Sequence, residues 1–389
     1  MAIVLIVGML LSMNQTTVYA KTNAYEKPIV IVLDPGHGGH DSGATCYWGG
    51  RWYREKTLNL AIAKACKAKL EQYDSTNVPL QGPSMDGVLL QLEVTNACNH
   101  KCVFCPNHAS DRKKRFIDFN FAQRCIVECA KFLGEEKKIC FHMNGEPFLY
   151  KQLPELIKTA KAEEFEYIFV TTNGTVGTND YLAEIFASGL DSIKFSINAG
   201  TREDYLKIHG RDDFDKAIAA LKFSDHWRKT HNQNLKIFVS CVGVKENKAG
   251  LLTLKNTVSD YCDEVLFYYP CAYAGQEIEH ARQMRCDLSD LNLKTFDIKH
   301  TKPCPVLWNS INITCDGYLA LCCSSGLDNR LLVEDVREKS IKEAWLGKRM
   351  ELIREKHIGG NILDTPCYSC ITENVYCADK MNKDLFQWI

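Results

Sequence analysis

The sequence has almost no excess charge of either sign, and its apolar N-terminus is too short to cross a membrane. Its 47 Lys and Arg residues nearly balance 48 Asp and Glu residues, which gives a formal net charge of −1. Such a balance gives no electrostatic reason to bind nucleic acid or an anionic membrane. The apolar stretch at residues 2–13 falls short of the roughly 20 residues of a spanning helix. We therefore expect no nucleic-acid partner and no stable membrane span.

The first 20 residues nevertheless have the pattern of an export signal. The apolar stretch is followed by polar residues 14–17 and then by Val-Tyr-Ala, which ends at Ala20. An apolar core followed by a small-residue cleavage site is typical of secretory signals, although no Lys or Arg precedes this one. A buried strand or helix is the alternative. We expect residues 1–20 to derive from an export signal.

Cysteine is abundant and points to metal rather than to disulfides. The chain has 19 cysteines, an odd number, and several stand at short, metal-type spacings. A disulfide framework explains that pattern poorly, whereas reduced thiols that bind metal explain it well. We therefore expect the chain to work in a reducing compartment, the cytoplasm.

The densest cysteine group is Cys98, Cys102 and Cys105, with Phe104 before the last. Thiolates at these offsets can converge on one soft metal centre, and three of them leave one iron of a 4Fe–4S cluster open. The group resembles the C-x3-C-x2-C signature of the radical SAM superfamily. That resemblance implies that S-adenosylmethionine (SAM) binds the open iron and is cleaved to a 5′-deoxyadenosyl radical. The alternatives are a zinc site completed by His100 or His108, or buried thiols without metal.

From residue 88 onward the sequence alternates between strand and helix patterns. Strands are predicted at residues 88–94, 138–142, 167–171, 193–197, 235–244 and 264–268, and helices at 153–162, 180–187, 213–227 and 251–258. Regular alternation predicts an α/β fold with a parallel sheet. It resembles the partial (β/α)6 TIM-like barrel of radical SAM enzymes, in which function lies at the carboxyl ends of the strands.

Polar motifs follow three of these strands. Gly145-Glu146-Pro147 resembles the family's G-E-P motif, whose acidic group and backbone hold the methionyl ammonium of SAM. Asn173 ends the next strand, and Ser196 and Asn198 end the one after it; there we expect contacts to ribose or carboxylate. An ordinary turn would explain an Asn-Gly pair equally well.

A second cysteine group lies near the C-terminus, at Cys304, Cys322, Cys367 and Cys370. Asp316-Gly317 predicts a tight hairpin between residues 309–314 and 318–321 that would bring the first two cysteines together, and a helix is predicted near residues 341–355. The group resembles the shortened SPASM or "twitch" domain, which implies one auxiliary 4Fe–4S cluster in a small cysteine-rich domain of β-hairpin and helix. A structural four-cysteine zinc site is the alternative.

Residues 21–78 form a separate α/β fragment. A predicted strand at residues 28–33 leads into a Gly-rich turn with His37, and Glu55 opens an amphipathic helix. A His and a Glu placed in this way could share a zinc ion. The fragment resembles the N-terminal third of zinc-dependent N-acetylmuramoyl-L-alanine amidases. The family's second ligand His and catalytic Glu have no counterpart, so we expect a truncated, inactive piece that binds zinc only if it is functional.

The resemblances imply an enzyme with a Pro- and Gly-containing linker at residues 79–87, a radical SAM barrel at 88–300 and an auxiliary domain at 301–389. We expect it to oxidise or epimerise a small or peptidic substrate, with electrons from a flavodoxin- or ferredoxin-type donor. Cys241 and Cys271, near strand ends, are candidate hydrogen-atom donors for epimerisation. The alternatives are a zinc amidase acting on peptidoglycan and a non-catalytic, zinc-stabilised binding protein.

Overall fold

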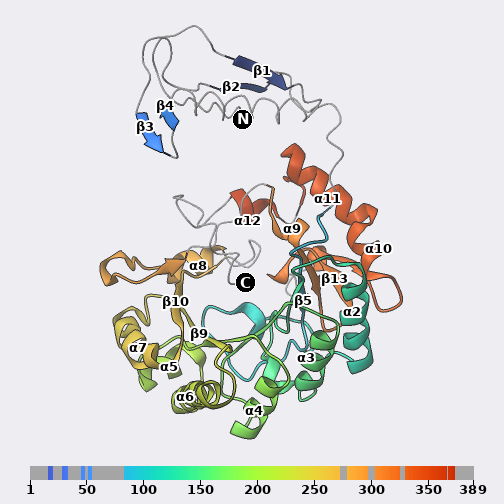
Figure 1. Cartoon of the computed structure of the whole chain (residues 1–389). Coiled ribbons are helices and arrows are strands. Elements are labelled where there is room, and N and C mark those ends of the chain that lie inside the picture. The colour runs from blue at the N-terminus through green and yellow to red at the C-terminus, as the bar shows by residue number, and fades with distance from the viewer. Residues whose placement is uncertain are drawn as a thin grey trace. The chain divides into compact units, whose positions relative to one another are not determined.

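The computed structural model of the chain describes residues 16–20, 29–33, 45–48, 51–54, 83–271, 278–296, 303–324, 329–365 and 367–372 (Figure 1). The chain divides into two compact units, residues 1–82 and 83–389. This boundary falls within the residues predicted to be a linker, 79–87.

The N-terminal unit contains two pairs of antiparallel strands. β1 (Thr16–Ala20) pairs with β2 (Ile29–Leu33), and β3 (Thr45–Trp48) pairs with β4 (Arg51–Arg54). β2 matches the strand predicted at residues 28–33. β1 lies in the segment with the export-signal pattern. The predicted zinc ligands His37 and Glu55, and the helix predicted to begin at Glu55, lie outside the described residues.

The larger unit is built on one ten-stranded sheet in the order β11-β10-β9-β8-β7-β6-β5-β12-β13-β14. Six adjacent strands run parallel. They are β5 (Leu89–Leu92), β6 (Lys138–Cys140), β7 (Tyr167–Thr172), β8 (Ser192–Ser196), β9 (Lys236–Val242) and β10 (Glu264–Tyr268). All six match predicted strands, and the α/β, partial (β/α)6 architecture is confirmed, with a sheet that does not close.

Helices cross from each parallel strand to the next and lie along the outside of the curved sheet (Figure 1). They are α2 (Phe119–Phe132), α3 (Leu153–Ala162), α4 (Asn179–Ala187), α5 (Arg202–His209), α6 (Phe214–His231) and α7 (Leu251–Val258). The sequence did not predict α2 or α5. α5 is short and largely polar, so it has little of the apolar periodicity that announces a helix.

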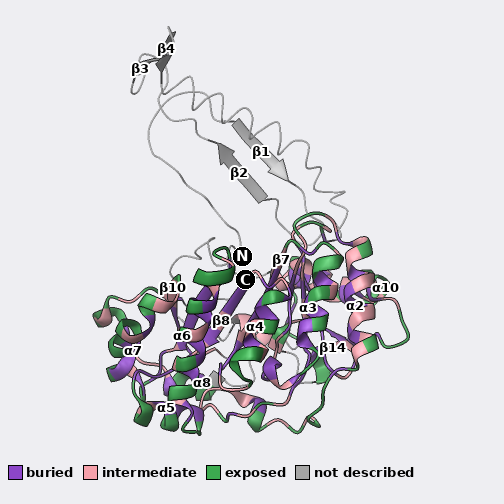
Figure 2. Cartoon of the chain, turned by 60° about the horizontal axis from the view of Figure 1, so that its bottom comes forward, coloured by how far each residue is buried: buried purple, intermediate pink, exposed green. Residues whose placement is uncertain are grey.

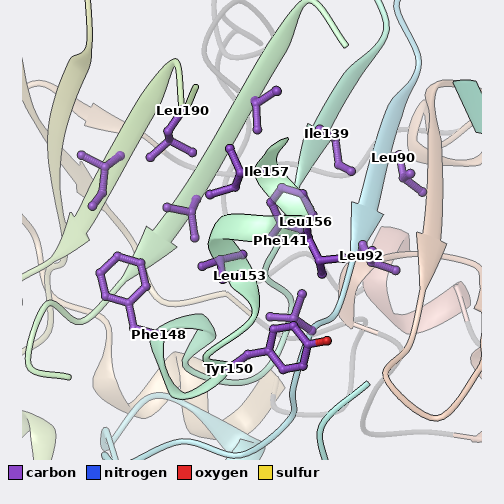
Figure 3. Packing of buried hydrophobic residues seen from close by; sticks show 14 of the residues in the cluster. Leu90, Leu92, Ile139, Phe141, Phe148, Tyr150, Leu153, Leu156, Ile157 and Leu190 are labelled. Carbon is purple, nitrogen blue, oxygen red and sulfur yellow. The ribbon is translucent and has the colours of Figure 1, made fainter. Parts of the chain in front are cut away.

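The two faces of the sheet differ because successive side chains of a strand point to opposite sides. On the outer face, Leu90 and Ile139 join Leu156 and Ile157 of α3 in one hydrophobic core (Figure 3). Figure 2 shows the buried residues running along the strands and the sheet-facing sides of the helices. The inner face carries the alternate residues, among them the polar Gln91, Thr171 and Lys194.

The C-terminal strands extend the barrel sheet. β12 (Ser310–Ile313) pairs in parallel with β5, and β13 (Tyr318–Ala320) and β14 (Leu332–Asp335) continue in antiparallel order. The predicted hairpin therefore forms, with Gly317 at a φ of 92° in its turn. The predicted auxiliary domain thus shares its sheet with the barrel.

The α-helices and strand not yet named include β11, which pairs with β10 at the far edge of the sheet from β12, β13 and β14. They are α8 (Ile278–Met284), β11 (Thr295–Phe296), α9 (Val306–Asn309), α10 (Ile341–Leu346), α11 (Lys348–Gly359) and α12 (Tyr368–Thr372). The prediction of a single helix near residues 341–355 is wrong in one respect. The segment forms two helices, α10 and α11, which are separated at Gly347. Gly347 has extended backbone angles and so cannot continue the helix. Within the described ranges, no helix is both long enough and apolar enough to span the bilayer.

Candidate active site

The loop after β5 carries the first cysteine group and is held by the end of α5. The Lys101 amide donates to the His209 carbonyl over 3.0 Å, and the Val103 amide donates to the Ile208 carbonyl over 2.9 Å. Gly210 follows in the left-handed conformation, at a φ of 69°, which lets the chain turn away beneath the loop. Backbone hydrogen bonds from an unpredicted helix therefore fix the shape of the cysteine loop.

The three thiols of this loop lie near one another. The Cys98 residue is exposed, yet desolvation of its thiol raises the thiol pKa to about 12, and Cys105 adds to the rise. Burial also raises the pKa of Cys102 well above its usual value, helped by Cys105 and Cys98. Each thiol resists ionisation while its neighbours are anionic, so a cation among them would stabilise all three thiolates. The donor set fits a cluster with three protein ligands.

Other metal-binding side chains also lie close together. Among the described residues, two groups of metal-binding side chains have all their ligand atoms within 4.8 Å: His100–Cys102–His209 and Glu93–Cys315–Asp316. Neither group contains two of the predicted cluster cysteines.

His209 contacts Cys102, and the sequence gave no local signal for this. Its Nδ1 lies 3.3 Å from the Cys102 sulfur, and its Nε2 lies 3.3 Å from the Asn198 amide nitrogen. A backbone amide can only donate, so Nε2 accepts and the proton of the neutral ring is on Nδ1. Burial, together with the charge of His100, lowers the pKa of His209 to about 3, which keeps the ring neutral. His209 therefore donates an N–H to the sulfur of Cys102.

His100, considered above as a zinc ligand, has a ring nitrogen within 4.8 Å of the Cys102 sulfur but also has polar partners of its own. Its Nε2 lies 3.3 Å from Asp213 Oδ2 and 3.3 Å from Thr175 Oγ1, and its ring meets His209 edge to face. Burial would raise the pKa of Asp213, but hydrogen bonds from Lys216, Arg211 and His100 lower it to about 2. His100 thus belongs to a buried polar chain behind the loop.

Glu146 is the centre of a hydrogen-bond network at the ends of β6 and β7. Oε1 accepts from Thr172 Oγ1 at 2.6 Å and from the Phe148 amide at 3.0 Å, and Oε2 accepts from the Asn173 amide at 2.7 Å. Burial raises the pKa of Glu146 to about 7 despite these donors. The carboxylate was expected to face a ligand ammonium; in the structure it also ties two strand ends together.

Gly145 is needed for a contact within the protein. A Cβ at this position would lie 2.2 Å from the Thr95 carbonyl oxygen and 2.7 Å from that of Ala97. The next residue, Glu146, donates its amide to Ala97 over 2.8 Å. The G-E-P segment, in which Pro147 is buried, therefore packs directly on the start of the cysteine loop.

The other predicted contact residues occupy neighbouring strand ends. Asn173 donates from Nδ2 to Asn99 Oδ1 at 2.8 Å, which links it to the cysteine loop. Asn198 accepts the Val242 amide at 2.7 Å and approaches His209. Ser196 is the last residue of β8. Phe104 packs beside Ile208, Val244 and Met284.

The second cysteine group also comes together. Burial raises the pKa of Cys304 to about 11 and that of Cys367 to about 12; Cys322 adds to both shifts. Burial raises the pKa of Cys370 as well, with contributions from Cys322, Cys304 and Cys367. His357 of α11 accepts the Cys304 amide at Nδ1, over 3.2 Å. Four thiols from three segments, 304, 322 and 367–370, therefore form one candidate site.

The two candidate hydrogen donors are placed very differently. Cys241 is 1% exposed and lies in the hydrophobic core on the outer face of β9. That position corrects the expectation, because residues 237, 239 and 241 share one face and this face packs against helices. Cys271 follows β10. Its charge, when ionised, would help raise the pKa values of Cys370 and Cys323, so it lies beside the second cysteine site.

The structure also shows a buried ion cluster that the sequence did not suggest. Arg112 bonds both oxygens of Glu93, at 3.2 and 2.8 Å, and Oδ1 of Asp316 at 2.8 Å. Glu93 also accepts the Cys315 amide at 3.0 Å. The cluster joins the end of β5 to the turn of the C-terminal hairpin.

Comparison with family models gives three matches. Residues 92–233 match the radical SAM superfamily, residues 304–371 the iron–sulfur cluster-binding domain SPASM, and residues 31–104 N-acetylmuramoyl-L-alanine amidase. The amidase match continues past the predicted fragment into the cysteine loop, where the described residues belong to the barrel.

Curated relatives match only part of the chain. A probable GTP 3′,8-cyclase of Saccharolobus solfataricus is 29% identical over 140 residues, which is 34% of this chain and 42% of the relative. The GTP 3′,8-cyclase of Chlorobaculum tepidum is 30% identical over 138 residues, 34% of this chain and 39% of the relative. The chain thus spans about two fifths of the length of these relatives.

Solved structures share the fold. Streptococcus suis SuiB bound to the precursor peptide SuiA has a TM-score of 0.56 and 17% identity, over 77% of this chain and 72% of that chain. The protein anSMEcpe with bound AdoMet has a TM-score of 0.51 and 14% identity, over 71% and 81%. The cofactors that the matched domains imply are 4Fe–4S clusters and SAM. The family matches thus identify a radical SAM region at residues 92–233 and a SPASM region at residues 304–371, preceded by an amidase-like segment that begins at residue 31.

Proposed function

We propose that the chain is a radical SAM enzyme that oxidises or epimerises a small or peptidic substrate. When bound, a reduced 4Fe–4S cluster and SAM supply a 5′-deoxyadenosyl radical that abstracts a substrate hydrogen. The observation that carries the proposal is the group of three mutually interacting thiols beside the Glu146 network, at the carboxyl ends of the parallel strands.

Cys98, Cys102 and Cys105 would hold the first cluster. His209 would orient Cys102 and stabilise its thiolate by hydrogen bonding from Nδ1. The strand ends at Glu146, Asn173, Ser196 and Asn198, with Phe104, would bind SAM. The proton of Glu146 is important here, because a carboxyl with a pKa of about 7 ionises readily once an ammonium approaches it.

Cys304, Cys322, Cys367 and Cys370 would hold an auxiliary cluster. Four thiolates leave no open iron position, so this site suits electron acceptance rather than substrate ligation. Cys271, beside this site, would be the better placed of the two candidate hydrogen donors. Electron uptake by the auxiliary site would give oxidation, whereas hydrogen return from a thiol would give epimerisation.

The relatives suggest the range of substrates. Two are named for a nucleotide, GTP, and SuiB is bound to a peptide. A flavodoxin- or ferredoxin-type protein would supply electrons, and the reduced thiols favour the cytoplasm as the site of action. The barrel would comprise residues 88–300 and the auxiliary region residues 301–389, joined through the common sheet.

The test is anaerobic reconstitution of the full chain with iron and sulfide, followed by dithionite and SAM. We expect about eight irons per chain and formation of 5′-deoxyadenosine. Cys102→Ala should abolish the nucleoside while the auxiliary iron remains. The matched control is Cys125→Ala, at a buried thiol of α2 outside both sites, which should retain both. Zinc in place of iron, or nucleoside formation by Cys102→Ala, would refute the proposal.

A further inference from the structure

The inner face of β7 and β8 carries a lysine that the proposed SAM site does not use. Lys194 lies on β8 opposite Thr171 of β7, and both alternate with residues of the outer core. Its Nζ stands 5.7 Å from the centroid of the Tyr268 ring, and the buried Cys140 thiol also lies near it. In the described part of the chain, Lys194 has no carboxylate partner and no hydrogen bond. Glu264, on β10, is paired with Lys294.

His142, just past the end of β6, presents a second donor to the same region. The Thr171 amide donates to His142 Nδ1 over 3.3 Å, so the neutral ring carries its proton on Nε2. Burial, together with the charge of Lys194, lowers the pKa of His142 to about 3, so the ring stays neutral. The Nε2–H group is therefore a fixed donor beside a cation.

Thr171 adds an unused polar group between these two. Its Oγ1 is buried and has no hydrogen-bond partner in the described part of the structure. A buried hydroxyl without a partner costs free energy, and so does a desolvated ammonium without a counterion. Burial accordingly lowers the pKa of Lys194. An anion bound among the three groups would accept a hydrogen bond from the Thr171 hydroxyl and neutralise the Lys194 ammonium, which would offset both costs.

We propose that Lys194, His142 and Thr171 form a subsite on the inner face of the barrel that binds an anionic oxygen group, a carboxylate or a phosphate, of the substrate. The proposal rests on the proposed function, because it assigns a substrate class to the same barrel. Three donor groups come from neighbouring positions: the ammonium of Lys194, opposite Thr171 in register; the Thr171 hydroxyl; and the N–H of His142, whose ring accepts the Thr171 amide. Such a set matches the acceptor oxygens of either anion.

The position of the subsite gives it a role in positioning the substrate. Thr171 is followed by Thr172, whose side chain points to the other side of the strand and bonds Glu146 at 2.6 Å. An anion held at Lys194 would therefore anchor the substrate next to the strand ends where SAM is proposed to bind. Fixing one end of a substrate in this way limits which hydrogen lies close enough to react.

The experiment uses the full chain, reconstituted anaerobically with iron and sulfide and titrated calorimetrically without SAM. The probes are inorganic phosphate and acetate. Lys194→Met removes the charge at similar volume, Lys194→Arg keeps it, and His142→Phe removes the imidazole donor. Lys158→Met is the control, since Lys158 is exposed on α3. Iron content and the absorption near 400 nm verify that each variant folds and holds its clusters.

We expect at least one anion to bind the wild type, and Lys194→Met to weaken that binding at least tenfold. His142→Phe should weaken it about threefold, while Lys194→Arg and Lys158→Met stay within twofold of the wild type. Tighter binding of phosphate would indicate that the substrate presents a phosphate to the subsite, and tighter binding of acetate that it presents a carboxylate. No binding by the wild type, or equal affinity in Lys194→Met, would overturn the subsite. Wild-type 5′-deoxyadenosine formation, measured on the same preparation, tests the proposed function separately.

Discussion

Removing Arg112 should reveal how firmly the barrel and the C-terminal hairpin are joined. The side chain of Glu93 is 0% exposed, and Arg112 neutralises it with two hydrogen bonds while also bonding Asp316. Arg112→Met would leave the Glu93 carboxylate buried without a countercharge. Losing one partner of a buried pair costs about 3–5 kcal/mol. The Asp316 bond adds less, because that carboxylate is 23% exposed.

A double-mutant cycle separates the ion pair from simple loss of packing. Glu93→Gln alone should cost about 1–3 kcal/mol, because its amide must replace a carboxylate that accepts from Arg112 twice, from the Cys315 amide and from Asn144 Nδ2. In the double variant Arg112→Met/Glu93→Gln neither charge of this pair remains. Its loss of unfolding free energy should therefore be about 2 kcal/mol smaller than the sum of the losses in the two single variants. The free energy of unfolding of the full chain in urea, at matched iron content, measures each value.

The stability that this ion pair contributes depends on pH. Burial would raise the pKa of Glu93, but Arg112 holds it below the ordinary value of 4.5. The stabilisation is therefore present above pH 4.5 and lost as the pH falls through the folded-state pKa. The difference between wild type and Arg112→Met should shrink in acid. Additive losses in the cycle, or a difference that grows in acid, would refute the argument; Arg337→Met, at the exposed pair with Asp335, should change stability little.

Three further predictions concern the cysteine loop and its neighbours. Gly145→Ala should displace the loop, because the new Cβ meets the Thr95 oxygen at 2.2 Å; reconstituted iron should fall by about half, to the auxiliary site alone. His209→Leu should make the midpoint potential of the first cluster roughly 40 mV more negative, since a lost N–H to Cys102 destabilises the more negative reduced state by about 1 kcal/mol; EPR-monitored redox titration measures it. The raised pKa of Glu146, about 7, means that its contribution to stability is complete below pH 4.5 and lost as the pH rises through 7. Between pH 4.5 and pH 7, this group should lower the unfolding free energy of the wild type by about 3 kcal/mol. Glu146→Gln should not show that decrease when its unfolding in urea is compared at the two pH values.

Local patterns in the sequence predicted the six parallel strands and both cysteine groups, because strand periodicity and ligand spacing are local properties. They could not predict the contact of His209 with Cys102, which joins residues 107 positions apart. α5, which carries His209, lacks an apolar stripe and so gave no signal. The Cys241 error had a different source: strand alternation already placed Cys241 on one face with Val239, and that face proved to be the outer core.

The pairing of β12 with β5 was also beyond local reasoning, yet it governs how the two metal sites are related. Ile313 stands opposite Leu92 in parallel register, and the Glu93 amide donates to the Ile313 carbonyl over 2.9 Å. β5 and β12 therefore end on the same side of the sheet. From there β5 leads to Cys98, and β12 leads to the hairpin turn. A tethered domain could move away, whereas here separation would break a sheet ladder together with the Arg112 ion cluster. The distance between the two proposed clusters is thus set by the sheet, and electron transfer between substrate and auxiliary site would require no domain closure.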